Sequence, residues 1–264
     1  MAGCLVVPTN SLRGMENCSV GLISPKADII NGVPMENQSP PAAFGKDMAA
    51  SHDQRVAKLA PMREALHLFI RMVFGALPDN ARMLCVGAGT GPELIYLAQA
   101  FPGWQYVAVD RSGAMLDVCR NRARENGVAE RCTFHEGTFE TLGEVEPFDA
   151  ATSLLVSRFI FDTDARREFY AQIAQRLRPG GILVSADLAT GASAPQYKSL
   201  YEVWERTMRY TGMPVLSIDR IGDKMSVLAP QEVRAIIASA GFEEPVQFFQ
   251  ALLIHACYAK RLGV

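Results

Sequence analysis

The sequence MLCVGAGTGPELIYLA at residues 83–98 decides the fold. It starts with the apolar run MLCV, which is typical of a buried strand. Gly87, Gly89 and Gly91 follow at alternate positions, and Pro92 opens an apolar segment with helical spacing. A strand that enters a helix through such a turn can bring its backbone close to a ligand, and the helix offers free N–H groups there. A glycine-rich turn without a ligand is the alternative interpretation.

The composition is that of a globular protein. The chain has 264 residues, of which 49% are hydrophobic and 20% are charged, enough for one α/β domain with a tail or a lid. A formal net charge of -2 favours no basic surface, so we expect no nucleic-acid partner. No apolar run approaches the roughly 18 to 20 residues of a membrane helix, so no membrane partner is expected. The 6 cysteines show no C-x-x-C spacing, which predicts no metal site and favours a cytoplasmic location.

Strand-like and helical segments alternate from residue 82 onward. We expect strands at MLCV, WQYVAVD, CTFHE, FDAATSLLV and GILVSADL. Helices are expected between them, and the last, ARREFYAQIAQRLRPGG, should be stopped by Pro179 and Gly180. Ser112 can cap the helix that follows WQYVAVD. This alternation predicts a parallel sheet that is flanked by helices and binds its ligand at the carboxyl ends of the strands. The segment VQFFQALLIHACYAKR predicts a closing pair of strands.

The chain divides into a tail and one domain. Residues 1–41 are rich in Pro, Gly, Asn and Ser and predict a disordered tail, so the domain should span residues 42–264. Residues 42–78 should form N-terminal helices, with Pro61 ending or kinking the first of them. Residues 190–229 should form a lid or substrate insertion that contains a polar-aromatic helix.

Two features narrow the choice of ligand for the glycine turn. The dinucleotide pattern G-x-G-x-x-G is not met, because Pro92 occupies the place of its third glycine, and a phosphate loop ending in Gly-Lys-Ser/Thr is absent. Asp110 ends the second strand about twenty residues after the turn, where a carboxylate can accept both hydroxyls of a ribose. Asp110 could instead only cap the next helix.

Five motifs follow one another along the chain: VGAGTG, VAVDRS, FHEGTFETL, FDAATSLLV and RLRPGGILV. Their order and spacing resemble those of the class I S-adenosylmethionine-dependent methyltransferases. The resemblance covers residues 55–259. It implies an α/β fold of three α/β/α layers, Rossmann-like, whose seven-stranded sheet is mostly parallel with an antiparallel last strand. It also implies S-adenosyl-L-methionine as the cofactor and S-adenosyl-L-homocysteine as its product.

The resemblance assigns the methionine and ribose contacts. Gly87, Ala88 and Gly89 would wrap the methionine part of the cofactor, and Asp110 would hold the ribose. Leu155 ends the fourth strand, where the family passes the methyl group toward the acceptor.

The adenine contacts also follow from the resemblance. Arg111 and Met115 would border the adenine. The family usually has an Asp at the position of Thr138 that accepts the adenine amino group, and a hydroxyl can still accept that bond. Phe139 would pack against the ring.

Acceptor contacts are expected from the N-terminal helices, the segment after the fourth strand and the lid. The candidates for catalysis are His52, Arg158 and Tyr201, and those for substrate binding are Arg158, Phe159, Tyr197, Trp204, Tyr210 and Arg220. Arg158 directly follows an apolar strand and could meet a carboxylate or phosphate, or a structural partner. His52 could be a general base or a packing residue. Tyr201 and Trp204 could equally pack the lid.

A second, fainter resemblance concerns the segments SIDRIGDKMSVL and AGFEEPVQFFQALLIHACYAKR, which are similar to the carboxy-S-adenosylmethionine synthases. Those enzymes hold the carboxylate of their modified cofactor with an arginine, and Arg220 lies where that arginine would align. Their glycine turn usually reads Gly-Cys-Ser-Leu-Gly, whereas this chain has GAGTG.

The sequence therefore predicts an S-adenosylmethionine-dependent methyltransferase that acts on an anionic or aromatic small molecule, such as one of secondary metabolism. A carboxy-S-adenosylmethionine synthase-like enzyme and a non-catalytic cofactor-binding subunit are the alternatives. A homodimer is compatible with the sequence.

Overall fold

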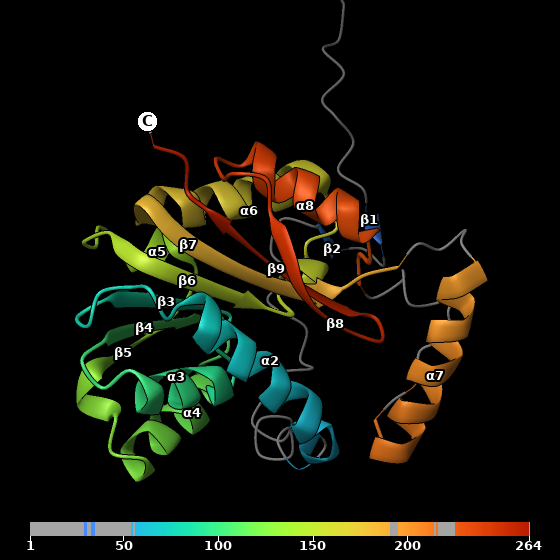
Figure 1. Cartoon of the computed structure of the whole chain (residues 1–264), viewed down its shortest axis with the longest axis horizontal. Helices are drawn as coiled ribbons and strands as arrows, with labels where there is room; N and C mark the ends of the chain where they lie inside the picture. Colours follow the sequence, from blue (N-terminus) through green and yellow to red (C-terminus); the bar gives the residue numbers. More distant parts are fainter. Residues whose placement is uncertain are drawn as a thin grey trace, which may run out of the picture. The chain divides into compact units, whose positions relative to one another are not determined.

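The structure is a computed structural model, and it describes residues 29–30, 33–34, 54, 56–190, 195–213, 215 and 225–263 (Figure 1). The strands β1 (Ile29–Ile30) and β2 (Val33–Pro34) pair antiparallel and belong to a first compact unit, Met1–Ser39. All other elements belong to a second unit, Pro40–Val264. Most of the predicted tail and the start of the predicted N-terminal helices lie outside the described residues, so the predicted division at residue 41 stays a prediction.

The second unit contains a seven-stranded sheet in the order β5-β4-β3-β6-β7-β9-β8. Its strands are β3 (Arg82–Val86), β4 (Gln105–Asp110), β5 (Cys132–Glu136), β6 (Phe148–Leu154), β7 (Leu177–Leu188), β8 (Val246–Ala251) and β9 (Ile254–Lys260). The first five pair in parallel, and β9 runs antiparallel between β7 and β8. The predicted Rossmann-like fold, with its last strand antiparallel, is therefore confirmed.

Helices cover both faces of this sheet. They are η3 (Ala57–Leu59), α2 (Ala60–Val73), α3 (Pro92–Ala100), α4 (Gly113–Glu125), η4 (Ala129–Arg131), α5 (Phe139–Leu142), η5 (Ser157–Phe159), α6 (Thr163–Arg176), α7 (Pro195–Thr211) and α8 (Pro230–Ser239). One apolar core lies between the sheet and α2, α3 and α4, and a second lies between the sheet and α5, α6 and α8 (Figure 1). The helical layers cover the faces of the sheet and not the ends of its parallel strands. Loops at these ends can form a site.

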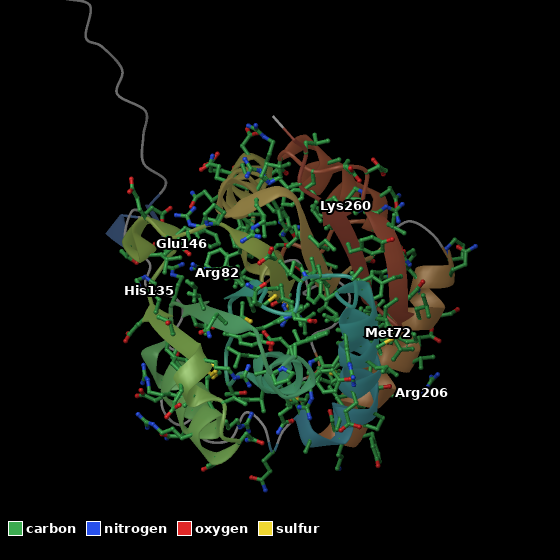
Figure 2. The ribbon with its side chains drawn as sticks, turned by 60° about the vertical axis from the view of Figure 1, so that its left-hand side comes forward. Met72, Arg82, His135, Glu146, Arg206 and Lys260 are labelled. Carbon is green, nitrogen blue, oxygen red and sulfur yellow. The ribbon has the colours of Figure 1, made fainter. Side chains whose placement is uncertain are left out.

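The amino and carboxyl ends of the parallel strands carry different contacts. At the amino end of β3, Arg82 forms an ion pair with Glu146, and the two side chains point toward one another in Figure 2. The backbone N–H of Arg82 also donates to the buried carboxylate of Asp149 at 2.7 Å. These contacts join β3 to the loop that leads into β6 and to β6 itself, and the glycine turn follows the opposite end of β3.

Pro61 lies in the first turn of α2, where its missing N–H removes no helical hydrogen bond. Residues 54 and 56 are helical and the 3-10 turn η3 follows them, which agrees with the expected end or kink of the first helix at this proline. One predicted helix boundary is wrong. Helix α6 ends at Arg176, before Pro179 and Gly180, which lie within β7. There the pairing of β7 with β6 shifts in register, and such an irregularity accommodates Pro and Gly inside a strand.

The lid helix α7 packs on the carboxyl end of β7 and on the β8–β9 hairpin. Leu188, Tyr201, Leu253 and Ile254 are buried together in what we call the lid cluster. The hairpin turn places Leu252 at a φ of +53°, an unfavourable conformation for a leucine. It allows Leu253 to reach the cluster with only 2% of its surface exposed.

None of the helices within the described ranges is long and apolar enough to cross a membrane.

The strained turn gives a first prediction. Leu252→Gly should raise the free energy of unfolding by about 1 kcal/mol, because glycine adopts a positive φ without the leucine penalty of about 1–2 kcal/mol. Urea unfolding measures this difference. The neighbouring Leu253→Ala should lower the same free energy by about 2–5 kcal/mol, because it leaves a cavity in the lid cluster. A loss of stability in Leu252→Gly as large as that in Leu253→Ala would show that the turn is not strained.

Candidate functional site

The glycine turn, residues 87–91, connects β3 to α3. Gly87 and Gly89 have φ values of +64° and +55°. A Cβ atom on Gly87 would lie 2.4 Å from Cγ2 of Val156, so this glycine lets the turn pack against the segment after β6. A Cβ atom on Gly89 would have no described atom within 4 Å. The backbone at Gly89 therefore borders open space, as a turn that receives a ligand requires.

Asp110 fixes this turn to the end of β4. Its Oδ2 accepts a hydrogen bond from the Gly89 N–H at 2.8 Å, and its Oδ1 accepts one from the Ser112 N–H at 2.8 Å. Burial raises the pKa of this carboxyl, and the hydrogen bonds from Ser112 and Gly89 oppose the rise. Each oxygen keeps a further lone pair, so the carboxylate can still accept the hydroxyls of a ribose. The predicted cap on α4 comes from Ser112, whose Oγ accepts from the Met115 N–H at 3.3 Å.

The predicted adenine contacts lie at the ends of β4 and β5. Arg111 is exposed, whereas Met115 is buried in the first turn of α4. Thr138 precedes α5, and its N–H donates to Oγ1 of Thr141 at 3.1 Å. A side-chain hydrogen bond from Thr138 lowers the pKa of Glu140, so its hydroxyl already has a partner within α5. The Phe139 ring is 6% exposed and belongs to the core on the α6 side, so little of it is free to face an adenine.

These residues fit an adenosyl cofactor. Gly89 borders open space, and Asp110 ends the neighbouring strand at the same end of the parallel strands. Arg111 is exposed directly after Asp110. The open space at Gly89 is the observation on which the fit depends, because a side chain at that position would fill it.

Glu93 is a site residue that the sequence analysis does not single out. It lies in the first turn of α3 and is only 7% exposed. Burial raises its pKa to about 7, and the nearby charge of Asp110 adds to the rise, while hydrogen bonds to backbone N–H groups of Glu93 and Leu94 lower it. Glu93 forms no ion pair with another described residue. In the sequence, an acidic residue in the first turn of a helix looks like an ordinary partner of the helix dipole, so its burial gives no signal.

Arg158, which the sequence predicts as an acceptor contact, lies near Asp187 of β7. Its Oδ2 accepts hydrogen bonds from Oγ of Ser157 at 2.6 Å and from the Arg158 N–H at 2.9 Å. Its Oδ1 accepts from the Leu188 N–H at 3.0 Å. Burial raises the pKa of this carboxyl, and the positive charge of Arg158 is the strongest influence that lowers it. Asp187 therefore holds the η5 turn, with Arg158 in it, against the carboxyl end of β7.

The guanidinium of Arg158 has unused hydrogen-bonding capacity. Its Nε is buried and has no hydrogen-bond partner among the described residues. The group lies 5.0 Å from the centre of the Phe159 ring, and Phe159 is 42% exposed. Burial lowers the pKa of Arg158, but arginine remains charged in proteins. A buried, charged donor without a partner at this edge of the sheet is suited to an anionic ligand.

The predicted lid residues separate into two groups. Tyr201 is buried in the lid cluster, and Tyr197, Trp204 and Leu155 pack against it. Tyr210 is 70% exposed at the other end of α7, so the structure does not bring it to the others. Its carbonyl accepts a hydrogen bond from Nζ of Lys58 in η3. The candidates His52 and Arg220 lie outside the described residues.

Leu155 joins the two halves of the site. It follows β6 with a φ of +62°, and its N–H donates to the carbonyl of Ala186 at 2.7 Å. Its side chain packs against the lid cluster, while that of its neighbour Val156 packs against Gly87. A leucine in this conformation is strained, and such strain is common at ligand sites.

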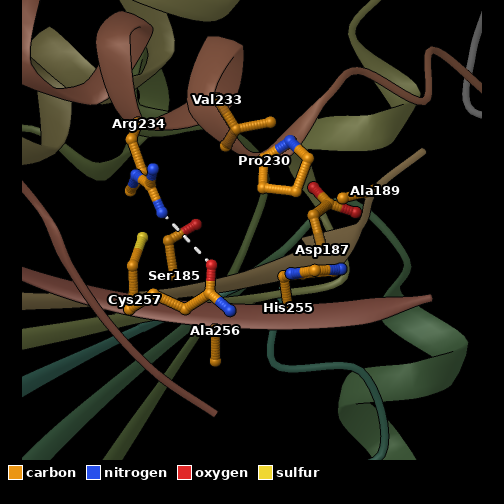
Figure 3. Close-up of a pocket in the computed structure, with 10 residues that line it drawn as sticks. Ser185, Asp187, Ala189, Pro230, Val233, Arg234, His255, Ala256 and Cys257 are labelled. Carbon is orange, nitrogen blue, oxygen red and sulfur yellow. Dashed lines mark hydrogen bonds between the residues drawn. The ribbon is translucent and has the colours of Figure 1, made fainter. Parts of the chain in front are cut away.

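A pocket lies on the other side of Asp187, between α8 and the β7–β9 pair (Figure 3). Asp187 and His255 are direct partners across the two strands, and both line the pocket. Arg234 of α8 donates to Oε1 of Gln247 at 3.2 Å. None of the predicted cofactor residues lines this pocket, so it is separate from the glycine turn.

A known protein family matches the part of the chain that forms this site. The family described as a methyltransferase domain matches residues 83–181, which run from β3 into β7 and contain the glycine turn and Asp110. The carboxy-S-adenosyl-L-methionine synthase of Campylobacter lari is 27% identical over 188 residues, which cover 70% of this chain and 76% of that protein.

Solved structures agree on the fold. An O-methyltransferase family protein of Burkholderia thailandensis superposes with a TM-score of 0.58 at 15% identity, covering 85% of this chain and 65% of that chain. An S-adenosylmethionine-dependent methyltransferase of Methanosarcina mazei superposes with a TM-score of 0.55 at 15% identity, covering 72% of this chain and 97% of that chain. Identities this low establish the shared architecture and leave the acceptor open.

The open space at Gly89 gives the second prediction. Gly89→Asn should lower the affinity for S-adenosyl-L-homocysteine at least a hundredfold, because the side chain enters the space next to the turn while asparagine tolerates a positive φ. Calorimetric titration measures the affinity, and thermal unfolding shows that the variant folds. Gly127→Asn is the matched control, since Gly127 also has a positive φ and an open surrounding but follows α4. Equal affinities in both variants would remove Gly89 from the site.

Glu93 gives the third prediction, which concerns the stability of the unliganded protein. The pKa of Glu93 is about 7 in the folded chain and its ordinary value is 4.5, so between these values the folded state binds more protons than the unfolded state. Its contribution to stability is therefore complete below pH 4.5 and is lost as the pH rises to 7. Glu93→Gln, which keeps a neutral side chain, should be more stable than the unchanged protein at pH 8 by up to about 3 kcal/mol.

Urea unfolding at pH 5 and pH 8 tests this expectation. The exposed Glu130→Gln should show no difference at either pH. A Glu93→Gln variant that is less stable than the unchanged protein at pH 8 would contradict the prediction.

Proposed function

Because the chain belongs to the class I S-adenosylmethionine-dependent methyltransferases, we propose that it methylates a small molecule with an anionic group on an apolar or aromatic body. The observation that supports this acceptor class is the buried, unpartnered Nε of Arg158 at the edge of the sheet. The lid cluster and the exposed Phe159 provide apolar surface beside this charge.

The cofactor, when bound, supplies a methyl group on a sulfonium that is already a good leaving group. The chain therefore chiefly needs to align the acceptor and exclude water, and orientation alone can lower a barrier by about 7–11 kcal/mol. The glycine turn and Asp110 hold one side of the reaction. Leu155 stands between that turn and the lid cluster, where the acceptor would meet the methyl group.

Arg158 would hold the anionic end of the acceptor. The turn that carries it is fixed by Asp187 through Ser157 and through its own N–H, so the guanidinium is positioned before the acceptor arrives. Tyr197, Tyr201 and Trp204 of α7 would cover the apolar body. An amine acceptor could react without a base, and an oxygen or carbon acceptor would use Tyr201 or His52.

A second function has a specific observation in its favour. The curated relative from Campylobacter lari is named a carboxy-S-adenosyl-L-methionine synthase, and it matches 70% of this chain. In that reaction the anionic group would belong to the modified cofactor itself, and Arg220 or Arg158 would hold it. Mass spectrometry of the ligand that co-purifies with the protein distinguishes the two functions, because a carboxylated sulfonium would favour the synthase.

Arg158 gives the fourth prediction. Against a panel of small carboxylic and phenolic acids with tritiated S-adenosyl-L-methionine, Arg158→Gln should raise the acceptor KM about tenfold to a hundredfold, since a hydrogen bond to a charged group contributes about 1.5–3 kcal/mol. The Kd for S-adenosyl-L-homocysteine should change less than twofold. Arg158→Lys keeps the charge but loses the planar pair of donors, so its KM should lie between that of the unchanged protein and that of Arg158→Gln. An equal loss of cofactor and acceptor affinity in Arg158→Gln would assign Arg158 a structural role.

A further inference from the structure

Glu93 is buried without a positive charge to balance it. The groups around it come from three elements: Asp110 of β4, Cys85 of β3 and Cys119 of α4. Burial raises the pKa of both thiols, so these cysteines are neutral. Asp110 is a second carboxyl. The surroundings of Glu93 therefore contain one like charge and no cation from these strands and this helix.

Basic groups on the packed helices α4 and α2 have contacts of their own. Arg122 of α4 donates to the carbonyl and to Oγ1 of Thr90 at 3.3 Å each. Helix α2 packs against α3 through His67, whose ring lies 5.5 Å from that of Tyr96. Burial and the charge of Arg63 lower the pKa of His67 to about 4, so it is neutral near pH 7.

The glycine turn lies directly before Glu93 in the chain. Gly91 precedes α3, and Glu93 is the second residue of the helix. Asp110 links the two parts, because it bonds to Gly89 in the turn and acts electrostatically on Glu93. The two carboxyls thus belong to one region, where the glycine turn meets the start of α3.

S-adenosyl-L-methionine carries a sulfonium and an α-ammonium, and S-adenosyl-L-homocysteine keeps only the ammonium. A cation that approaches a buried carboxyl favours its charged form. We propose that Glu93 is the counter-ion of the cofactor's α-ammonium group, and that cofactor binding therefore releases a proton from Glu93. This inference depends on the cofactor alone, so the failure of every tested acceptor leaves it standing.

The size of the proton release follows from titration. At pH 6.5 a group with a pKa of about 7 is roughly three-quarters protonated. If the ammonium holds Glu93 in its charged form, binding should release about 0.7 protons per chain. At this pH the ligand's own amine stays protonated, so it adds nothing to the count.

Calorimetric titration of the full chain at pH 6.5, in two buffers with different ionisation enthalpies, measures this count. S-adenosyl-L-homocysteine is the first probe, and 5′-methylthioadenosine, which lacks the amino-acid end, is the second. We expect a release of about 0.7 protons with the first probe and none with the second. This comparison needs no variant, so it stands even if a substitution at Glu93 prevents folding.

Two variants sharpen the assignment. Glu93→Gln should release no proton with either probe, and its affinity should fall for S-adenosyl-L-homocysteine but not for 5′-methylthioadenosine. Glu130→Gln, at an exposed position in η4, should behave as the unchanged protein. An equal proton release with both probes, or an undiminished release in Glu93→Gln, would overturn the proposal.

Discussion

The carboxylate of Asp110 joins the two turns on which the site depends. One oxygen accepts from Gly89 in the turn after β3, and the other accepts from Ser112 at the start of α4. The two turns follow the neighbouring parallel strands β3 and β4. The Asp110 side chain therefore links the start of α3 to the start of α4. A ligand that binds Asp110 therefore meets a surface that is fixed before it arrives.

A second carboxylate, that of Asp187 in β7, fixes another segment near the proposed acceptor residues. Asp187 accepts from Ser157 and Arg158 and so fixes the segment after β6. In that segment, Leu155 contacts the lid cluster and Val156 contacts the glycine turn. The strain at Leu155 is thus located where the two halves of the site meet. Helix α7, Arg158 and the glycine turn are connected through these few residues.

The fold could be predicted because its signals are local in the sequence. The alternation of strands and helices, the glycine turn and the Ser112 cap each depend on residues a few positions apart. Pro179 and Gly180 were assigned wrongly because their place in β7 depends on pairing with β6, which is distant in the sequence.

The candidate cofactor residues are easier to propose from the sequence than the candidate acceptor residues, for the same reason. Asp110 and the glycines belong to a short motif, and the structure places them at one edge of the sheet. Glu93 could not be found from the sequence, because its burial is produced by β3, β4 and α4 together. The free Nε of Arg158 likewise depends on distant strands.

The central claim is that the glycine turn and Asp110 hold an adenosyl sulfonium or its thioether product, and not a dinucleotide. Calorimetric titration of the unchanged protein with S-adenosyl-L-homocysteine, with NAD as the control, tests it most directly. The account predicts one-to-one binding of the thioether in the micromolar range and no binding of NAD. Binding of NAD, or of neither ligand, would contradict it.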